Sequence, residues 1–134
     1  MTAEGQPPRL SDLARQLLDA PSIGHLATLM RDGSPQCSAV WVSRDEDLIV
    51  INSVDGRVKV ANVRRDPRVA LSLTARDDPD ISVSIRGLVR EVTFEGAEDL
   101  IDDLSEKYYG VRPYPLRTPG MRRIILVIEP TEVN

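Results

Sequence analysis

The sequence predicts a mainly β fold with short helices, in which six antiparallel strands form a small barrel. Six segments have the alternating or continuous apolar pattern of strands, and most are joined by turns instead of helices, which argues against parallel α/β winding. A barrel also removes exposed sheet edges. With 134 residues, 41% of them hydrophobic, we expect a single domain over 1–134 with a flexible N-terminal arm at 1–9.

The first elements are a helix and a hairpin. Ser11 is a candidate N-cap for a helix with apolar residues at helical spacing, and Pro21 ends that helix. The strand at 23–30, the turn at 31–33 and the strand at 36–43 then form an antiparallel hairpin.

Alternation along the second strand places Gln36 and Ser38 on one face and Cys37 and Trp41 on the other. If the first face lines a cavity, Gln36 and Ser38 bind a ligand; if it faces water, they are ordinary surface residues, and both alternatives remain open. Cys37 has apolar neighbours and is predicted to be buried and inert. His25 is interpreted as a core or rim residue of the first strand, with catalytic use as the lesser alternative.

Four more strands are predicted, at 48–53, 69–74, 81–93 and 123–129. Gly87 interrupts the alternation of the third of these, which indicates a bulge or a sharp bend. The last strand is apolar on both faces and is therefore predicted to be central or covered.

A helix is predicted over 97–108, and the acidic residues on its outer side are interpreted as solubilising and as favourable to the helix dipole. The loop at 109–121 contains three prolines and is not expected to be regular. It is either a plain connector or a wall over a ligand. In the second case Tyr109 and Tyr114 would offer flat surfaces, and Arg112 and Arg117 would contact an anionic group.

The stretch 52–68 concentrates anion-binding chemistry. A strand ends at Asn52 and Ser53, and an Asp-Gly turn leads into a helix opened by Arg57 and Lys59. From Arg57 to the end of the stretch there are five basic residues and one acidic residue, in a chain of net charge −4. The free N–H groups and dipole of a helix N-terminus favour an anion. A small anionic ligand is therefore indicated, with a solvated charged helix as the alternative.

Composition excludes several classes of protein. No apolar run is long enough for a membrane span, and no secretory signal is visible, so a cytoplasmic location is expected. One cysteine and one histidine exclude an internal disulfide and the usual zinc sites, and no metal is expected. Five scattered aromatic residues and the acidic net charge argue against nucleic acid as a partner.

Several segments together carry a family resemblance. They are GSPQ at 33–36 with Ser38 and Val40-Trp41, Asn52-Ser53, the run from Gly56 to Arg68, Lys107-Tyr108 with Gly110, and RPYP at 112–115. They resemble the flavin/deazaflavin split-barrel superfamily, which includes pyridoxamine phosphate oxidase. The similarity extends from about residue 22 to residue 133 and is greatest to the branch that uses the deazaflavin coenzyme F420.

The resemblance implies a Greek-key split β-barrel of the FMN-binding type and a homodimer with its cofactor at the subunit interface. It implies an oxidoreductase that transfers a hydride between coenzyme F420 and a small unsaturated acceptor. The alternatives are an FMN-binding oxidoreductase of the pyridoxamine phosphate oxidase type and a non-catalytic coenzyme-binding protein. Because the coenzyme carries the chemistry, no catalytic side chain is predicted.

The resemblance also implies which residues bind the cofactor. Arg57 and Lys59 would bind its phosphate with support from the end of the preceding strand, and Trp41 would pack near the ring or at the dimer seam. This chain has Val58 where the pyridoxamine phosphate oxidases carry an arginine. The candidate cofactor-binding residues are Gln36, Ser38, Trp41, Asn52, Ser53, Arg57, Lys59 and Asn62.

Overall fold

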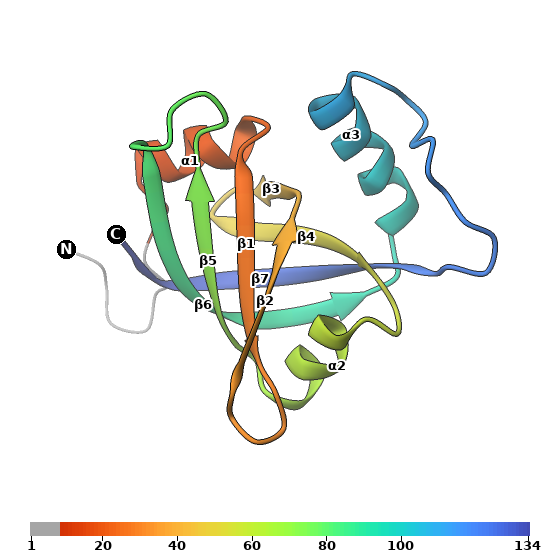
Figure 1. Cartoon of the computed structure of the whole chain (residues 1–134), viewed down its shortest axis with the longest axis horizontal. Coiled ribbons are helices and arrows are strands. Elements are labelled where there is room, and N and C mark those ends of the chain that lie inside the picture. The colour runs from red at the N-terminus through yellow and green to blue at the C-terminus, as the bar shows by residue number, and fades with distance from the viewer. Residues whose placement is uncertain (1–8) are drawn as a thin grey trace.

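The structure, a computed structural model, describes residues 9–134, so the predicted arm at 1–9 falls almost wholly outside the described residues. One antiparallel sheet of seven strands curls into an open barrel that carries three helices (Figure 1). In chain order the elements are α1 (Asp12–Asp19), β1 (Ile23–Leu29), β2 (Pro35–Val40), β3 (Val42–Asp45), β4 (Leu48–Val54), α2 (Val58–Arg65), β5 (Arg68–Thr74), β6 (Ser82–Thr93), α3 (Ala97–Tyr109) and β7 (Arg123–Val133).

The prediction of one strand over 36–43 was wrong, and the sheet has seven strands instead of six. The order β2-β1-β5-β6-β7-β4-β3 makes β2 and β3 the two edges, although only Trp41 separates them in the chain. Up to Val40 the chain pairs with β1, and from Val42 it pairs with β4. The barrel is therefore open along a seam at Trp41. A Cβ atom on Gly24 would lie 2.7 Å from Val42 Cγ1, so glycine permits this close approach.

The bulge predicted at Gly87 is confirmed. The register between β6 and β7 shifts between Arg86 and Gly87, and it shifts again between Val89 and Glu91. A Cβ atom on Gly87 would lie 2.6 Å from the backbone oxygen of Glu129, a distance that no side chain tolerates. The two shifts bend the long strand β6 around the barrel.

Aliphatic side chains from alternate strand positions fill the barrel, and helices cover both of its ends. Ser11 caps α1 by accepting a hydrogen bond from the Ala14 N–H, as predicted, and the helix buries Leu17 and Leu18. Helix α2 lies at the other end of β1 (Figure 1). The last strand is covered, as predicted. Its interior residues belong to the core, and α3 lies against its outer face.

The acidic side of α3 holds the following loop in place, in addition to the solubilising role expected of it. Arg112 binds Asp103 at 2.6 Å, and Arg117 binds Glu98 at 3.0 Å and Asp102 at 2.7 Å. The loop is irregular, as its prolines predict, but these ion pairs fix its course along the helix. No helix in the described part of the chain has the length and apolar character needed to cross a membrane.

Candidate functional site

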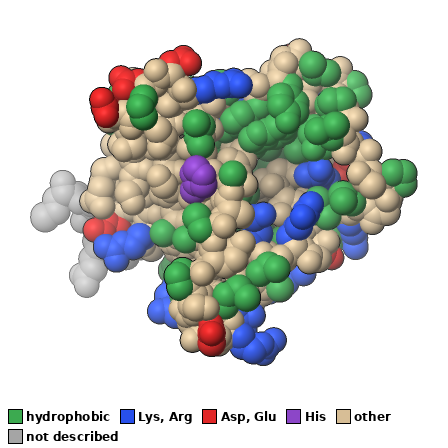
Figure 2. Space-filling view, viewed as in Figure 1, with side chains coloured by type: hydrophobic (Ala, Val, Ile, Leu, Met, Phe, Trp, Pro, Cys, Tyr) green, Lys and Arg blue, Asp and Glu red, His purple; other side chains and the backbone are tan. Residues whose placement is uncertain are grey.

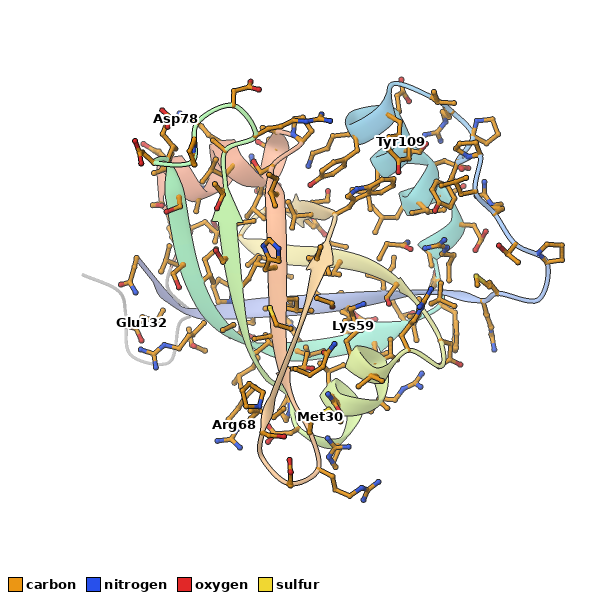
Figure 3. The ribbon with its side chains drawn as sticks, in the orientation of Figure 1. Met30, Lys59, Arg68, Asp78, Tyr109 and Glu132 are labelled. Atoms are coloured by element: carbon orange, nitrogen blue, oxygen red, sulfur yellow. The ribbon has the colours of Figure 1, made fainter. Side chains whose placement is uncertain are left out.

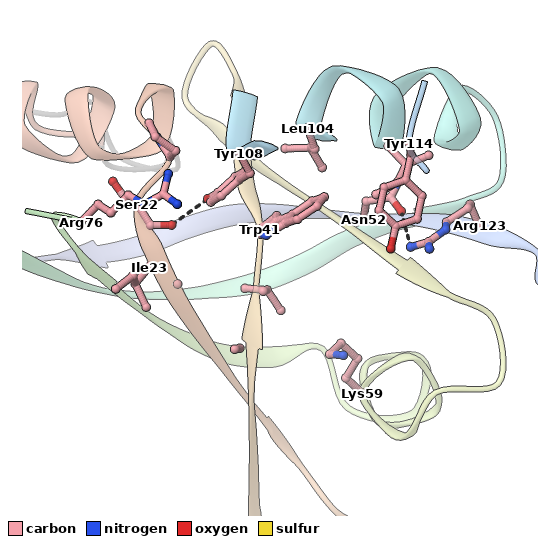
Figure 4. A pocket seen from close by; sticks show the side chains of 15 residues that line it. Ser22, Ile23, Trp41, Asn52, Lys59, Arg76, Leu104, Tyr108, Tyr114 and Arg123 are labelled. Carbon is pink, nitrogen blue, oxygen red and sulfur yellow. Dashed lines mark hydrogen bonds between the residues drawn. The ribbon is translucent and has the colours of Figure 1, made fainter. Parts of the chain in front are cut away.

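A cavity of about 390 Å³ lies at the seam of the barrel, a volume within the range of small-molecule sites. The edge of β2, the end of β4, the first turn of α2 and the inner side of α3 surround it (Figure 4). In Figure 2 a patch of hydrophobic side chains lies above the hollow, and basic side chains lie along its lower rim. The site is therefore built from elements that are distant in sequence.

Aromatic rings form one wall of the cavity. Trp41 stacks on Tyr108 with ring centroids 4.9 Å apart and an interplanar angle of 9°. Tyr109 and Tyr114 contact the same indole edge-on, at 4.9 and 5.9 Å. Such a wall presents flat apolar surface with hydroxyl groups at its edges, which suits a planar ligand.

The free edge of β2 forms a second wall. This strand pairs with β1 on one side only, and Ala39 and Val40 line the cavity. Backbone N–H and C=O groups on the unpaired edge are available to a ligand. A ring with amide-like polar groups at its rim could therefore hydrogen-bond to the backbone here.

Lys59 is the basic group of the first turn of α2. It points from the helix toward the space between β2 and β4 (Figures 3 and 4) and lines the cavity. Its Nζ has no hydrogen bond or ion pair within residues 9–134, and burial, with the charge of Arg57, lowers its pKa. Arg57 is the N-cap of α2 but makes no side-chain cap hydrogen bond. A bound anion would stabilise both the lysine charge and the free N–H groups.

The other basic residues of the 57–68 stretch are engaged in the fold. Arg64 binds Asp55 at 2.9 Å, and Arg65 donates to a backbone carbonyl of β1 at 2.7 Å. Arg68 binds Asp66 at 2.7 Å and lowers the pKa of that carboxyl to about 2. Among the described residues, the cations of this stretch that lack such partners are the two at the start of α2.

The neighbouring residues Asn52 and Ser53 lie on opposite faces of β4, because successive side chains of a strand alternate. Asn52 lines the cavity, where its Nδ2 donates to the carbonyl of Ala97 at 2.8 Å and its Oδ1 accepts from Arg123 Nη1 at 3.4 Å. Ser53 points into the barrel and is 6% exposed. Of this pair, Asn52 is therefore the one placed to contact a ligand in the cavity.

Gln36, Ser38 and Asn62 lie behind the cavity and do not line it. Gln36 Oε1 accepts a hydrogen bond from Thr28 Oγ1 at 3.1 Å, and Asn62 Nδ2 donates to the same Oγ1 at 3.0 Å. Ser38 Oγ is buried and has no hydrogen-bond partner among the described residues. Thr28 of β1 thus connects Gln36 of β2 to Asn62 of α2.

The burial predicted for Cys37 is wrong, and for His25 the core alternative is excluded. Cys37 is exposed, not buried, because it lies on the outer face of β2, which no helix covers. His25 lies on the outer face of β1 and is also exposed, as Figure 2 shows. Neither residue lines the cavity.

Among the polar residues that line the cavity, the following were not predicted from the sequence to contact a ligand: Ser22, Arg76, Tyr108 and Arg123. They come from the α1–β1 junction, the loop after β5, the end of α3 and the start of β7. Only Tyr108 belonged to a segment of the family resemblance. No spacing in the sequence relates the others, so the signal that joins them is tertiary.

An open antiparallel barrel of seven strands with a cavity at its seam is the architecture of a split β-barrel. The family model described as pyridoxamine 5'-phosphate oxidase matches residues 10–134, and the chain belongs to this family. The split-barrel resemblance inferred from the motifs is thereby confirmed. The family is one of flavin-type oxidoreductases.

Similar solved structures support the same fold. A protein named F420 reductase has a TM-score of 0.79 and 31% identity, over 90% of this chain and 94% of that one. A conserved hypothetical protein from Mycobacterium tuberculosis has a TM-score of 0.71 and 26% identity, over 99% and 88%. A putative pyridoxamine 5'-phosphate oxidase from Listeria innocua has a TM-score of 0.64 and 20% identity, over 89% and 91%, and supports the fold alone.

Proposed function

We propose that this protein is an oxidoreductase that transfers a hydride between coenzyme F420 and a small unsaturated acceptor. The observation that carries the proposal is the position of Lys59. It is a half-buried cation without a partner among the described residues, on the uncapped first turn of α2. It lies in the same cavity as the stacked wall of Trp41 and Tyr108. The 31% identity to a protein named F420 reductase favours the deazaflavin.

The residues of the cavity fit such a coenzyme. When bound, the deazaflavin supplies the hydride chemistry. Lys59 and the free N–H groups of α2 bind its phosphate, and the N-cap residue Arg57 adds positive charge beside them. Trp41 offers a flat contact for the ring, and Asn52 and the edge of β2 offer polar contacts to its rim.

Because the coenzyme would carry the hydride chemistry, the protein's own part is to orient the reactants and to exclude water from the ring. No aspartate, glutamate, histidine or cysteine of the described chain lines the cavity. Reduction of the acceptor adds one hydride and one proton, and water at the open side of the cavity can supply the proton. A cavity wall of mainly apolar and aromatic surface, without carboxylate, imidazole or thiol groups, suits this division of labour.

An FMN-dependent oxidoreductase is the second candidate, and the match to the pyridoxamine 5'-phosphate oxidase family favours it. The same phosphate site and aromatic wall would serve FMN. A protein that binds the coenzyme without turnover is the third candidate, because no carboxylate, imidazole or thiol of the described residues lines the cavity.

We further propose that the protein is a homodimer. Ile23 and Ala39, on the exposed face of β1 and β2, line the cavity, and Ile23 is 47% exposed. A second copy placed over this face would shield a flat ring from water and bury apolar surface.

The test is to titrate the purified protein with coenzyme F420 and with FMN by calorimetry, and then to assay oxidation of the reduced coenzyme with a panel of unsaturated acceptors. Tighter binding of coenzyme F420 with turnover supports the proposal. Preference for FMN would overturn it in favour of the second candidate. Tight deazaflavin binding without turnover of any acceptor would favour the third.

A further inference from the structure

The cavity has a second basic end, which coenzyme binding through Lys59 does not use. Arg76, in the loop after β5, and Ser22, before β1, line it on one side (Figure 4). Lys59 lies on the other side, and Trp41 and Tyr108 lie between the two ends. The cavity is therefore elongated, with a cation at each end and aromatic surface between them.

Arg76 is available to a ligand. Its guanidinium makes no hydrogen bond or ion pair within the described residues, and its side chain is exposed. Burial raises the pKa of the Tyr108 phenol, and the hydrogen bond from the Val42 N–H and the charge of Arg76 oppose that rise. By contrast, Arg123 at the other end already contacts the Tyr114 ring at 5.0 Å and Asn52.

Ser22 supplies an independent indication of a ligand at this end. The residue is 1% exposed, and its carbonyl accepts a hydrogen bond of 2.7 Å from the Tyr108 hydroxyl. Its own hydroxyl oxygen is buried and has no hydrogen-bond partner among the described residues. A buried hydroxyl without a partner is unfavourable, and a change of the χ1 rotamer that turned it toward the cavity would let it donate to a ligand oxygen and remove that penalty.

We propose that the Ser22–Arg76 end binds the carboxylate of the acceptor, so that the substrates are planar, conjugated, unsaturated carboxylic acids. The guanidinium and the hydroxyl are both donors, and a carboxylate accepts from each. No acidic side chain of the described residues lines the cavity to compete for them. The assignment to the acceptor rests on the proposed function. The phosphate and the anionic tail of the coenzyme are both attached on one side of its ring. When the phosphate binds at Lys59, the opposite end of the cavity is therefore free for the acceptor.

The chain carries its own reporter for this test. Trp41 is the single tryptophan of the sequence and lines the cavity, so its fluorescence reports occupancy without any coenzyme. The probes are cinnamate, a planar unsaturated acid, and cinnamamide, which has the same shape without the charge. The variants are Arg76→Gln, Ser22→Ala and the control Arg90→Gln, which removes an exposed arginine from β6 that does not line the cavity.

Wild type should bind cinnamate more tightly than cinnamamide. Arg76→Gln should weaken cinnamate binding by about tenfold or more, with little effect on cinnamamide. Ser22→Ala should weaken cinnamate binding by several-fold. Arg90→Gln should change neither affinity. Equal affinity of wild type for the two probes, or equal effects of Arg76→Gln and Arg90→Gln, would overturn the proposal.

Two further measurements distinguish a wrong assignment of this end to the acceptor from a wrong proposed function. If Arg76→Gln weakens binding of coenzyme F420 with its glutamate tail, but not of a deazaflavin without the tail, the end binds the coenzyme and the acceptor assignment is wrong. If wild type binds no deazaflavin while the Arg76-dependent preference for cinnamate persists, the proposed function fails and the carboxylate site remains.

Discussion

Lys107 Nζ donates a hydrogen bond of 2.6 Å to the carbonyl oxygen of Val42, the first residue of the edge strand β3. The same ammonium also donates to the carbonyl of Leu18. The next residue, Tyr108, accepts a hydrogen bond from the Val42 N–H at 3.1 Å through its hydroxyl. Helix α3 thus supplies partners to the backbone immediately after the seam, and these contacts fix the position of Trp41.

We expect Lys107→Met to destabilise the fold by about 1 to 3 kcal/mol, because it leaves two backbone carbonyls without their donor. Urea unfolding followed by Trp41 fluorescence measures the change. Asp99→Asn, on the exposed side of the same helix, is the matched control and should change stability by less than about 0.5 kcal/mol. Equal stability of the two variants would show that the lysine bonds are not important for the seam.

Stability should also depend on pH through Lys107. Burial lowers the pKa of Lys107 to about 8, whereas a lysine in the unfolded chain has a pKa of about 10.4. Between these values the unfolded state binds more protons, so the free energy of unfolding should rise from about pH 8 to about pH 10. The contribution is lost as the pH falls through 8. Lys107→Met should show a smaller rise over this window than wild type.

We expect Lys59→Gln to weaken coenzyme binding by about 1.5 to 3 kcal/mol, the usual range for a charge-assisted hydrogen bond. Calorimetry at physiological salt measures it. The matched control is Arg64→Gln on the same helix, whose charge is already paired with Asp55. Unchanged affinity in Lys59→Gln, or an equal loss in both variants, would remove Lys59 from the phosphate site.

The loop after α3 should act through Tyr114, which lines the cavity, and not through its arginines, which are bound to α3. Tyr114→Ala should lower catalytic efficiency or coenzyme affinity, because it removes a ring that contacts Trp41. Tyr114→Phe should retain most of both. If Tyr114→Ala and Arg117→Ala leave coenzyme affinity and efficiency unchanged, the loop is only a connector.

Light scattering at micromolar concentration should give the mass of a homodimer. Ala27 lies on the outer face of β1, between Cys37 of β2 and Ala70 of β5 in the register, and it is only partly exposed. Ala27→Glu would place a charge in the centre of this small-residue face and should shift the mass toward the monomer. A monomeric wild type with coenzyme bound would contradict the dimer.

Local patterns were sufficient to predict most of the elements and the chemistry of the first turn of α2. Alternation predicts the strands because each needs only one covered face, and Ser11 and Gly87 mark a cap and a bulge through geometry that extends over a few residues. The excess of basic residues at 57–68 also follows from composition alone, and it identified Lys59 as a candidate.

The tertiary structure decided the features that depend on distant partners. Nothing within 36–43 shows that the chain changes partner strands at Trp41, because alternation continues through the change. Likewise, the sequence does not show which arginines near Lys59 form an ion pair or a hydrogen bond to a backbone carbonyl. It also does not show that Cys37 lies on an uncovered face. Burial and pairing are set by which surfaces the folded sheet brings together. Ser22, Arg76 and Tyr108 are distant in the sequence, so they line one cavity only after the sheet has curled into the barrel.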